Sequence, residues 1–126
     1  MVEIKNQNEF NKEYPKEVKE IKMEDEELAE QQLVIEDYPE LEELYLNDNE
    51  SINKIVLRNL AKLKECKIWK CNTEELIIEN CPQIKKLDVH NNSLTNLEFI
   101  KDLVDLEELK IDGNAELIKI LEPYDG

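Results

Sequence analysis

Glycine is scarce in this chain of 126 residues, which has only two glycines, four prolines, one histidine and three cysteines. Two glycines cannot build the glycine-rich loop that cradles a phosphate group, so a nucleotide site is not expected. The cysteines form no CxxC pair, and one histidine cannot complete a ligand set, so neither a zinc site nor a disulfide framework is predicted. We therefore expect no metal and no cofactor.

Positive charge and long apolar runs are also lacking. Sixteen Lys and Arg residues face 31 Asp and Glu residues, a net charge of −15, and such a surface repels phosphate backbones and anionic membranes. Uncharged apolar stretches such as 33–35 and 76–78 are too short to span a bilayer. The first residues, MVEIKNQNEF, show no apolar signal segment. We expect no nucleic-acid or membrane partner and an intracellular location, cytoplasmic or nuclear.

What the sequence has in abundance is leucine and isoleucine at regular spacing. Four segments, LEELYLNDN, LKECKIWKC, IKKLDVHNN and LEELKIDGN, begin at residues 41, 63, 84 and 106 and fit the pattern LxxLxLxx(N/C). A fifth segment, VKEIKMEDE, begins at residue 18 and keeps the apolar positions, but has Glu26 where the others have Asn or Cys. The segments begin 21–23 residues apart. Repeats of this length indicate a solenoid, in which each turn packs only against its neighbours.

The pattern resembles that of the leucine-rich-repeat superfamily over residues 18–121. The resemblance implies an α/β solenoid, a right-handed superhelix with a parallel concave sheet of about five strands and an irregular or short-strand convex side. We expect an N-terminal capping segment at 1–17, the solenoid at 18–121 with repeats starting at 18, 41, 63, 84 and 106, and a C-terminal tail at 122–126.

The ninth position of each repeat carries an amide or a thiol. In the superfamily this side chain bonds to backbone groups of neighbouring turns, which implies a ladder of Asn49, Cys71, Asn92 and Asn114. A buried polar group without a partner would be costly, so this column needs donors and acceptors. Cys66 takes a leucine position of the same motif, and we expect Cys66, Cys71 and Cys81 to be buried thiols.

A second periodic feature lies between the motifs. Apolar residues recur in alternation at Leu33/Ile35, Ile55/Leu57, Leu76/Ile78 and Leu97/Phe99. A period of two predicts short strands on the return path of the first three turns. In the fourth turn, the spacing of Leu97, Ile100 and Leu103 predicts a helical turn instead.

Two surfaces are candidates for self-association. The residues between the alternating pairs, Val34, Val56 and Ile77, are predicted to point outward as an apolar column. This column could seat an appended domain or a second copy of the chain, or Lys and Glu stems could cover it. The last strand, 109–111, has an edge that could also pair with a second copy.

The segment before the first repeat predicts a short helix. Asn6 or Asn8 can serve as its N-cap, Phe10 lies on it, and Pro15 stops it before the solenoid. The run NEFNKEYPKEVKEI is similar to the start of leucine-rich arrays in some intracellular fungal proteins.

The resemblance also implies a binding surface, because the third, fifth, seventh and eighth residues of each motif project from the concave sheet. The only Trp and the only His then share one column on adjacent turns, with a Tyr one column over. Trp, Tyr and basic residues are common in interface hot spots, whereas a lone Trp and His can also be ordinary surface residues. The predicted partner-binding patch consists of Tyr45, Lys67, Trp69, Lys70, Lys86, His90 and Lys110.

These features favour a non-catalytic module that binds a protein or peptide on its concave face. The alternative is an acidic binding module or chaperone for basic proteins such as histones, because residues 17–43 hold twelve acids and only two lysines. In this respect the chain resembles the acidic leucine-rich nuclear phosphoproteins, although it lacks their long acidic tail. Catalysis is not expected, since His90 and Asp88 would lie on an open sheet that does not exclude water.

Overall fold

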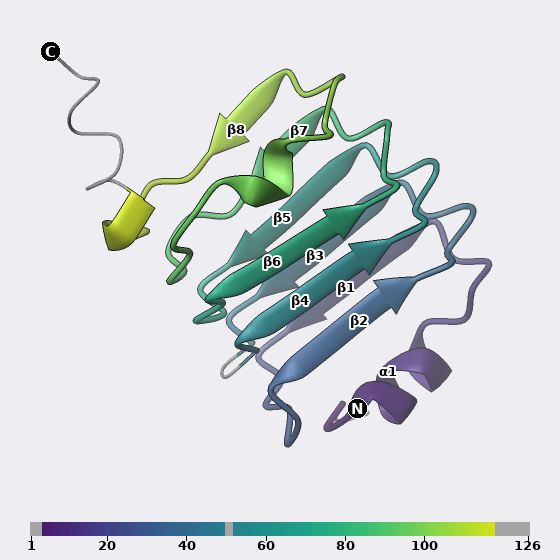
Figure 1. Ribbon diagram of the computed structural model, residues 1–126. Helices are drawn as coiled ribbons and strands as arrows, with labels where there is room; N and C mark the ends of the chain where they lie inside the picture. The colour runs from purple at the N-terminus through teal and green to yellow at the C-terminus, as the bar shows by residue number, and fades with distance from the viewer. Residues whose placement is uncertain (1–3, 50–51, 118–126) are drawn as a thin grey trace, which may run out of the picture.

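The computed structural model describes residues 4–49 and 52–117. It is a parallel β-solenoid of about four turns, with successive strands of each sheet about 22 residues apart. Two sheets form two layers, and the chain passes from one to the other in every turn (Figure 1). The predicted tail at 122–126 and the end of the predicted solenoid at 118–121 lie outside the described residues.

The larger sheet contains the LxL segment of every repeat. Its strands are β1 (Glu20–Glu24), β3 (Glu43–Asn47), β5 (Glu65–Trp69), β7 (Lys86–Asp88) and β8 (Glu108–Lys110), in that spatial order. All neighbouring strands are parallel and in register, so that Glu20 pairs with Glu43 and Glu43 with Glu65. In β1, β3 and β5 buried and accessible residues alternate, and the leucine positions of the motif face the interior.

The smaller sheet forms on the return path. Its strands are β2 (Gln32–Glu36), β4 (Lys54–Arg58) and β6 (Glu75–Glu79), again parallel and in that order. The three predicted return strands are therefore confirmed. The fourth turn has a short 3-10 helix, η1 (Glu98–Ile100), where the others have a strand. Here the Asn96 side chain accepts a hydrogen bond from the Glu98 backbone N–H at 3.0 Å, a local bond that favours a turn over extended chain.

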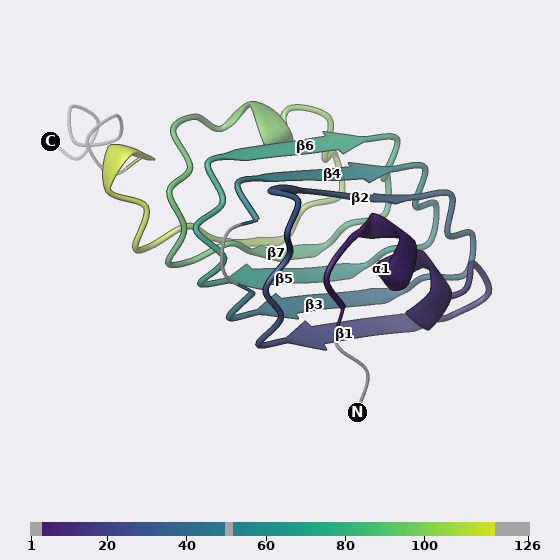
Figure 2. The same cartoon turned by 90° about the horizontal axis from the view of Figure 1, so that it is seen from below.

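The hydrophobic core fills the space between the two layers, which face each other in the view of Figure 2. Leucine, isoleucine and valine side chains from every turn form one continuous buried cluster. The helix α1 (Gln7–Glu13) lies at the end of this core beside the first turn (Figure 2). Asn6 is its N-cap, accepting from the Glu9 N–H at 2.9 Å, and Phe10 on its inner face is completely buried.

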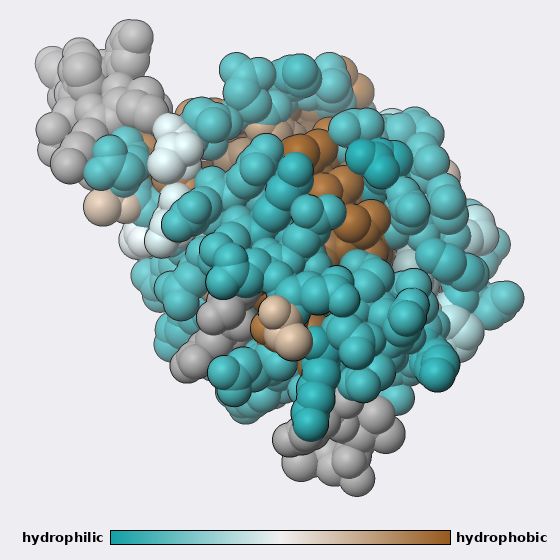
Figure 3. Space-filling model, turned by 60° about the horizontal axis from the view of Figure 1, so that its bottom comes forward, coloured by the Kyte–Doolittle hydropathy of each residue, from teal (hydrophilic) through white to brown (hydrophobic). Residues whose placement is uncertain are grey.

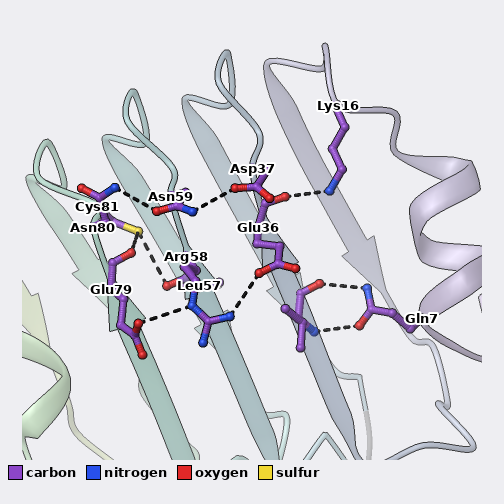
Figure 4. A network of polar contacts seen from close by, with 11 residues as sticks. Gln7, Lys16, Glu36, Asp37, Leu57, Arg58, Asn59, Glu79, Asn80 and Cys81 are labelled. Atoms are coloured by element: carbon purple, nitrogen blue, oxygen red, sulfur yellow. Dashed lines mark hydrogen bonds and ion pairs between the residues drawn. The ribbon is translucent and has the colours of Figure 1, made fainter.

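Two columns of residues with positive φ turn the chain at the strand ends, which explains how a solenoid forms with so little glycine. One column follows the larger sheet and the other follows the smaller one. They consist of Asp25, Asp48, Lys70, Asn91 and Gly113, and of Asp37, Asn59 and Asn80. Asn and Asp enter the left-handed region more readily than other residues with a side chain. In the second column, Asn80 donates to Asn59 at 2.8 Å and Asn59 to Asp37 at 2.9 Å (Figure 4).

The ninth-position side chains lie in the interior and bond to the backbone. The Asn49 amide donates to the Met23 carbonyl at 2.8 Å and accepts from the Glu26 N–H at 3.0 Å. Asn114 likewise donates to Ile111 at 2.8 Å and accepts from the Leu94 N–H at 3.1 Å. Each amide thus satisfies backbone groups that no strand partner reaches.

The three cysteines are free and buried, as predicted. The Cys71 thiol lies 3.2 Å from the Trp69 carbonyl and 3.7 Å from that of Leu46. Burial raises the pKa of Cys66 and Cys81, and raises that of Cys71 to about 11. Burial also raises the pKa of Tyr38 to about 12, and its hydroxyl donates to the Tyr14 carbonyl at 2.6 Å.

These shifts predict that the fold loses stability in alkali. A thiol or phenol with a raised folded-state pKa stabilises the fold fully below its unfolded pKa, about 8.5 for Cys and about 10 for Tyr. That contribution is lost as the pH rises toward about 11 for Cys71 and about 12 for Tyr38. Urea unfolding at pH 7.5 and at higher pH should show a falling midpoint. A midpoint that is the same at pH 7.5 and in strong alkali would contradict the expectation.

The apolar column Val34, Val56 and Ile77 is in register across the smaller sheet. Its surroundings are hydrophilic, and the apolar atoms form a narrow strip between charged side chains (Figure 3). Val34 and Ile77 are partly buried, but Val56 is only 4% exposed. Val56 lies on the central strand β4, between β2 and β6. Its side chain is therefore more buried than the outward-pointing column predicted from the sequence.

Candidate functional site

The outward face of the larger sheet arranges its side chains in columns because the strands are in register. Tyr45, Lys67 and Asp88 occupy one column and Asn47 pairs with Trp69 in the next. Trp69 and His90 come from adjacent turns, and their ring centroids lie 4.9 Å apart with planes inclined by 36°. The tilted contact is typical of aromatic pairs that attract each other.

A carboxylate fixes the histidine in this pair. Oδ1 of Asp88 lies 2.7 Å from Nδ1 of His90 and accepts a hydrogen bond from the His90 backbone N–H at 3.2 Å. Asp88 is only 8% exposed, which leaves its side chain few alternative positions. The two contacts hold the imidazole against the Trp69 ring, so the aromatic pair is preorganised.

Lysine ammonium groups lie over the aromatic rings. Nζ of Lys67 is 5.5 Å from the ring centroids of both Tyr45 and Trp69, and Nζ of Lys22 is 5.4 Å from that of Tyr45. Lys67 also forms an ion pair with Glu65 at 3.2 Å. Each such cation–π contact on a surface contributes about 0.5–1 kcal/mol. Lys67 therefore links the two aromatic rings of neighbouring turns.

Carboxylates surround the phenol of Tyr45. Burial, together with the smaller effect of the charges of Glu65 and Glu43, raises the pKa of Tyr45 to about 12. The pKa of Glu43 is itself raised, first by its hydrogen bond with Glu20 and then by burial. The start of each strand is thus acidic on the first three turns, where Glu20, Glu43 and Glu65 follow one another in register.

Two shallow depressions flank the Trp69 ring. One, of about 250 Å³, lies toward the N-terminal turns and contains Tyr45, Asn47 and Glu24. The other, of about 240 Å³, lies toward the C-terminal turns and contains Asp88, Lys86 and Lys110. Trp69 and Lys67 border both depressions. The ring therefore lies between the two hollows, and a partner that occupied either hollow would contact it.

The indole N–H of Trp69 is a donor without an acceptor. Nε1 is buried and has no hydrogen-bond partner among the described residues. Leaving a buried N–H unpaired costs about 1–3 kcal/mol, so the ring carries an unsatisfied group beneath the surface of this face.

The structure brings together most of the predicted patch. Lys67 lies over the rings of Tyr45 and Trp69, and Trp69 contacts His90. Lys86 and Lys110 line the second depression with Trp69. Lys70 has φ 53° in the turn after β5 and lines neither depression. Sequence reasoning did not include Asp88 in the patch, although the alternation Asp88-Val89-His90 placed both polar residues on one face.

The hollows are shallow and open, and the described residues contain no cluster of three or more His, Cys, Asp or Glu that could hold a metal ion. No helix in the described part of the chain is long and apolar enough to cross a membrane. The face offers aromatic surface, cations and hydrogen-bonding groups. No family model, no curated protein and no solved structure matches this chain.

Proposed function

We propose that this chain is a non-catalytic module of the leucine-rich-repeat type that binds a protein or peptide on the face of its larger sheet. The repeat LxxLxLxx(N/C) and the interior amides of Asn49, Asn92 and Asn114 support the leucine-rich-repeat assignment. In this proposal the sheet is the concave side of the solenoid, α1 is its N-terminal cap, and the chain works as an intracellular scaffold.

The observation that carries the proposal is the position of Trp69. The ring is partly buried, lies in tilted contact with His90 and is bordered by a hollow on each side, and its N–H has no partner among the described residues. A preorganised aromatic side chain contributes contact area at a low entropic cost, which is why Trp is enriched in hot spots. The charges around it are mixed, since Lys67, Lys86 and Lys110 stand beside Glu65 and Asp88.

We expect Trp69→Ala to weaken partner binding at least about tenfold while the fold is kept, because hot-spot truncations commonly cost more than about 1.4 kcal/mol. Affinity purification with the wild type should identify the partner. Because Trp69 is the only tryptophan, its fluorescence in a titration then reports contact with the face directly.

The matched control is Val104→Ala, which removes an 84% exposed apolar side chain that lines neither hollow. It should bind like the wild type. Retention of the same partner by Trp69→Ala with unchanged affinity would remove the patch from consideration.

A second candidate function is binding of basic proteins through the acidic first turns. The column Glu20, Glu43 and Glu65 and the net charge of −15 favour it. Binding through charge weakens steeply as salt is added, whereas aromatic-centred binding changes little. Measuring the partner affinity in low and high salt, with wild type and Trp69→Ala, therefore separates the two functions.

A further inference from the structure

The hydrogen-bonding groups of the smaller sheet alternate in direction along each strand. In a parallel ladder, the N–H and C=O of one residue point to the same neighbour, and those of the next residue point the other way. Asn59 N–H donates to the Glu79 carbonyl at 3.1 Å, and Glu75 N–H donates to the Asn53 carbonyl at 3.0 Å. The groups of Glu75, Ile77 and Glu79 therefore face β4. Those of Leu76 and Ile78 face away from it.

At the opposite edge of the same sheet, side chains form hydrogen bonds with the backbone N–H and C=O groups of β2 that face away from β4. The Gln7 amide donates to the Val34 carbonyl and accepts from the Val34 N–H, both at 2.8 Å. The Lys16 ammonium donates to the Glu36 carbonyl at 2.7 Å. Figure 4 shows both side chains reaching the edge of β2 from the N-terminal segment. Gln7 thus bonds to β2 as the backbone of a neighbouring strand would.

Among the described residues, no side chain forms hydrogen bonds of this kind at the β6 edge. The 3-10 helix η1 packs beside β6 (Figure 1), but no backbone hydrogen bond joins the two elements in residues 4–49 and 52–117. Within the same ranges, no group bonds to the outward N–H and C=O of Leu76 and Ile78. A depression of about 270 Å³ lies here, between β6 and η1. Unpaired strand groups beside a hollow are a template for another extended chain.

The lining of this hollow indicates what kind of chain would fit. Ile77 and Phe99 provide apolar surface, while Glu79, Glu98 and Asp102 provide three carboxylates against the single ammonium of Lys101. The ion pairs of Glu98 with Lys101 at 4.0 Å and of Glu79 with Arg58 at 3.3 Å are solvent-exposed, and such pairs are weak. The hollow therefore complements an apolar residue flanked by basic ones.

We propose that the β6 edge binds an extended basic peptide, which adds a strand to the smaller sheet. Its backbone pairs with the N–H and C=O of Leu76 and Ile78, an apolar side chain packs on Ile77, and its Lys or Arg residues face Glu79 and Asp102. This site lies on the opposite layer from Trp69, so it binds independently of the proposed partner face.

Amide hydrogen exchange followed by NMR tests the pairing directly. In the free protein, the amides of Leu76 and Ile78 should exchange faster than the Ile77 amide, which faces β4. Adding a short peptide of alternating lysine and valine should slow exchange at Leu76 and Ile78 at least about tenfold at saturation. The same peptide with N-methylated backbone amides keeps its side chains but cannot donate, and it should not protect these positions.

Charge-reversed variants test the choice of partner. Glu98→Lys combined with Asp102→Lys should weaken binding of the lysine–valine peptide at least about tenfold and favour a glutamate–valine peptide. Glu27→Lys with Glu30→Lys changes the net charge equally at exposed positions away from the hollow and serves as the matched control.

Three results would overturn the proposal: equal binding of the N-methylated peptide, equal weakening by the control pair, or unchanged exchange at Leu76 and Ile78 with millimolar peptide. Trp69→Ala should leave all these measurements unchanged, so failure here and failure of the proposed partner face are distinguishable.

Discussion

Replacement of Asn92 by alanine is expected to lower the free energy of unfolding by roughly 4 kcal/mol, since several buried groups lose their partners together. Oδ1 of Asn92 accepts from the Cys71 N–H at 3.0 Å and the Thr73 N–H at 3.3 Å. Nδ2 donates to the carbonyls of Ile68 at 2.8 Å and Val89 at 3.0 Å. Water cannot easily replace this side chain because the site is buried.

Urea unfolding monitored by circular dichroism measures the effect of Asn92→Ala. The control is Asn11→Ala on α1, where the removed amide is exposed and its oxygen accepts a hydrogen bond from the half-buried Gln7 side chain at 3.0 Å. A surface change of this type should alter stability by about 0.5 kcal/mol or less. If the two variants were equally stable, the interior amide column would not be essential to the fold.

The second large effect is expected for Gly113→Ala, which should destabilise the fold by about 2–4 kcal/mol through backbone strain and a steric clash. Gly113 has φ +77°, in the left-handed region. A Cβ placed there would lie 2.1 Å from Oδ1 of Asn91 and 2.9 Å from its backbone N. The side chain of Asn91 can move, but its backbone is tied to the Asp112 carbonyl at 2.9 Å.

A double-mutant cycle separates the two causes. Asn91→Gly removes the side chain that the new Cβ would meet and leaves the backbone contact in place. Gly113→Ala should therefore cost less in the Asn91→Gly background than in the wild type, with the backbone strain remaining. A chemical melt in which Gly113→Ala changes nothing in either background would show that this turn adapts freely.

The periodic residues made the fold predictable. Four copies of one motif set the register, and register alone placed Trp69 beside His90 and Tyr45 beside Lys67. The return strands followed from alternation in the same way. The fourth turn has the helical turn that its apolar spacing predicts, as the 3-10 helix η1, and Asn96 bonds locally to Glu98 where the other turns have a strand. Such competition between local and regular hydrogen bonds is not visible in apolar spacing.

Features that depend on side-chain direction could not be read from the sequence. Lys70 shares a repeat with Trp69, but the turn in which it lies directs it away from both hollows. The contact of Asp88 with His90 depends on rotamers of two residues on one strand. Gln7 closes the β2 edge across 27 residues of sequence, and no local pattern marks a glutamine for that role.

The in-register ladders also determine how the chain can assemble itself. Every strand except β6 and β8, the last of each sheet, bonds to the strand one turn later, so neighbouring contacts span about 22 residues in both sheets. The entropy of closing a loop depends on its length, and each added turn therefore requires a closure of nearly the same size. Folding can begin at any pair of turns and extend in both directions, as in a zipper. Its rate then depends on forming the first pair of turns and little on the length of the array.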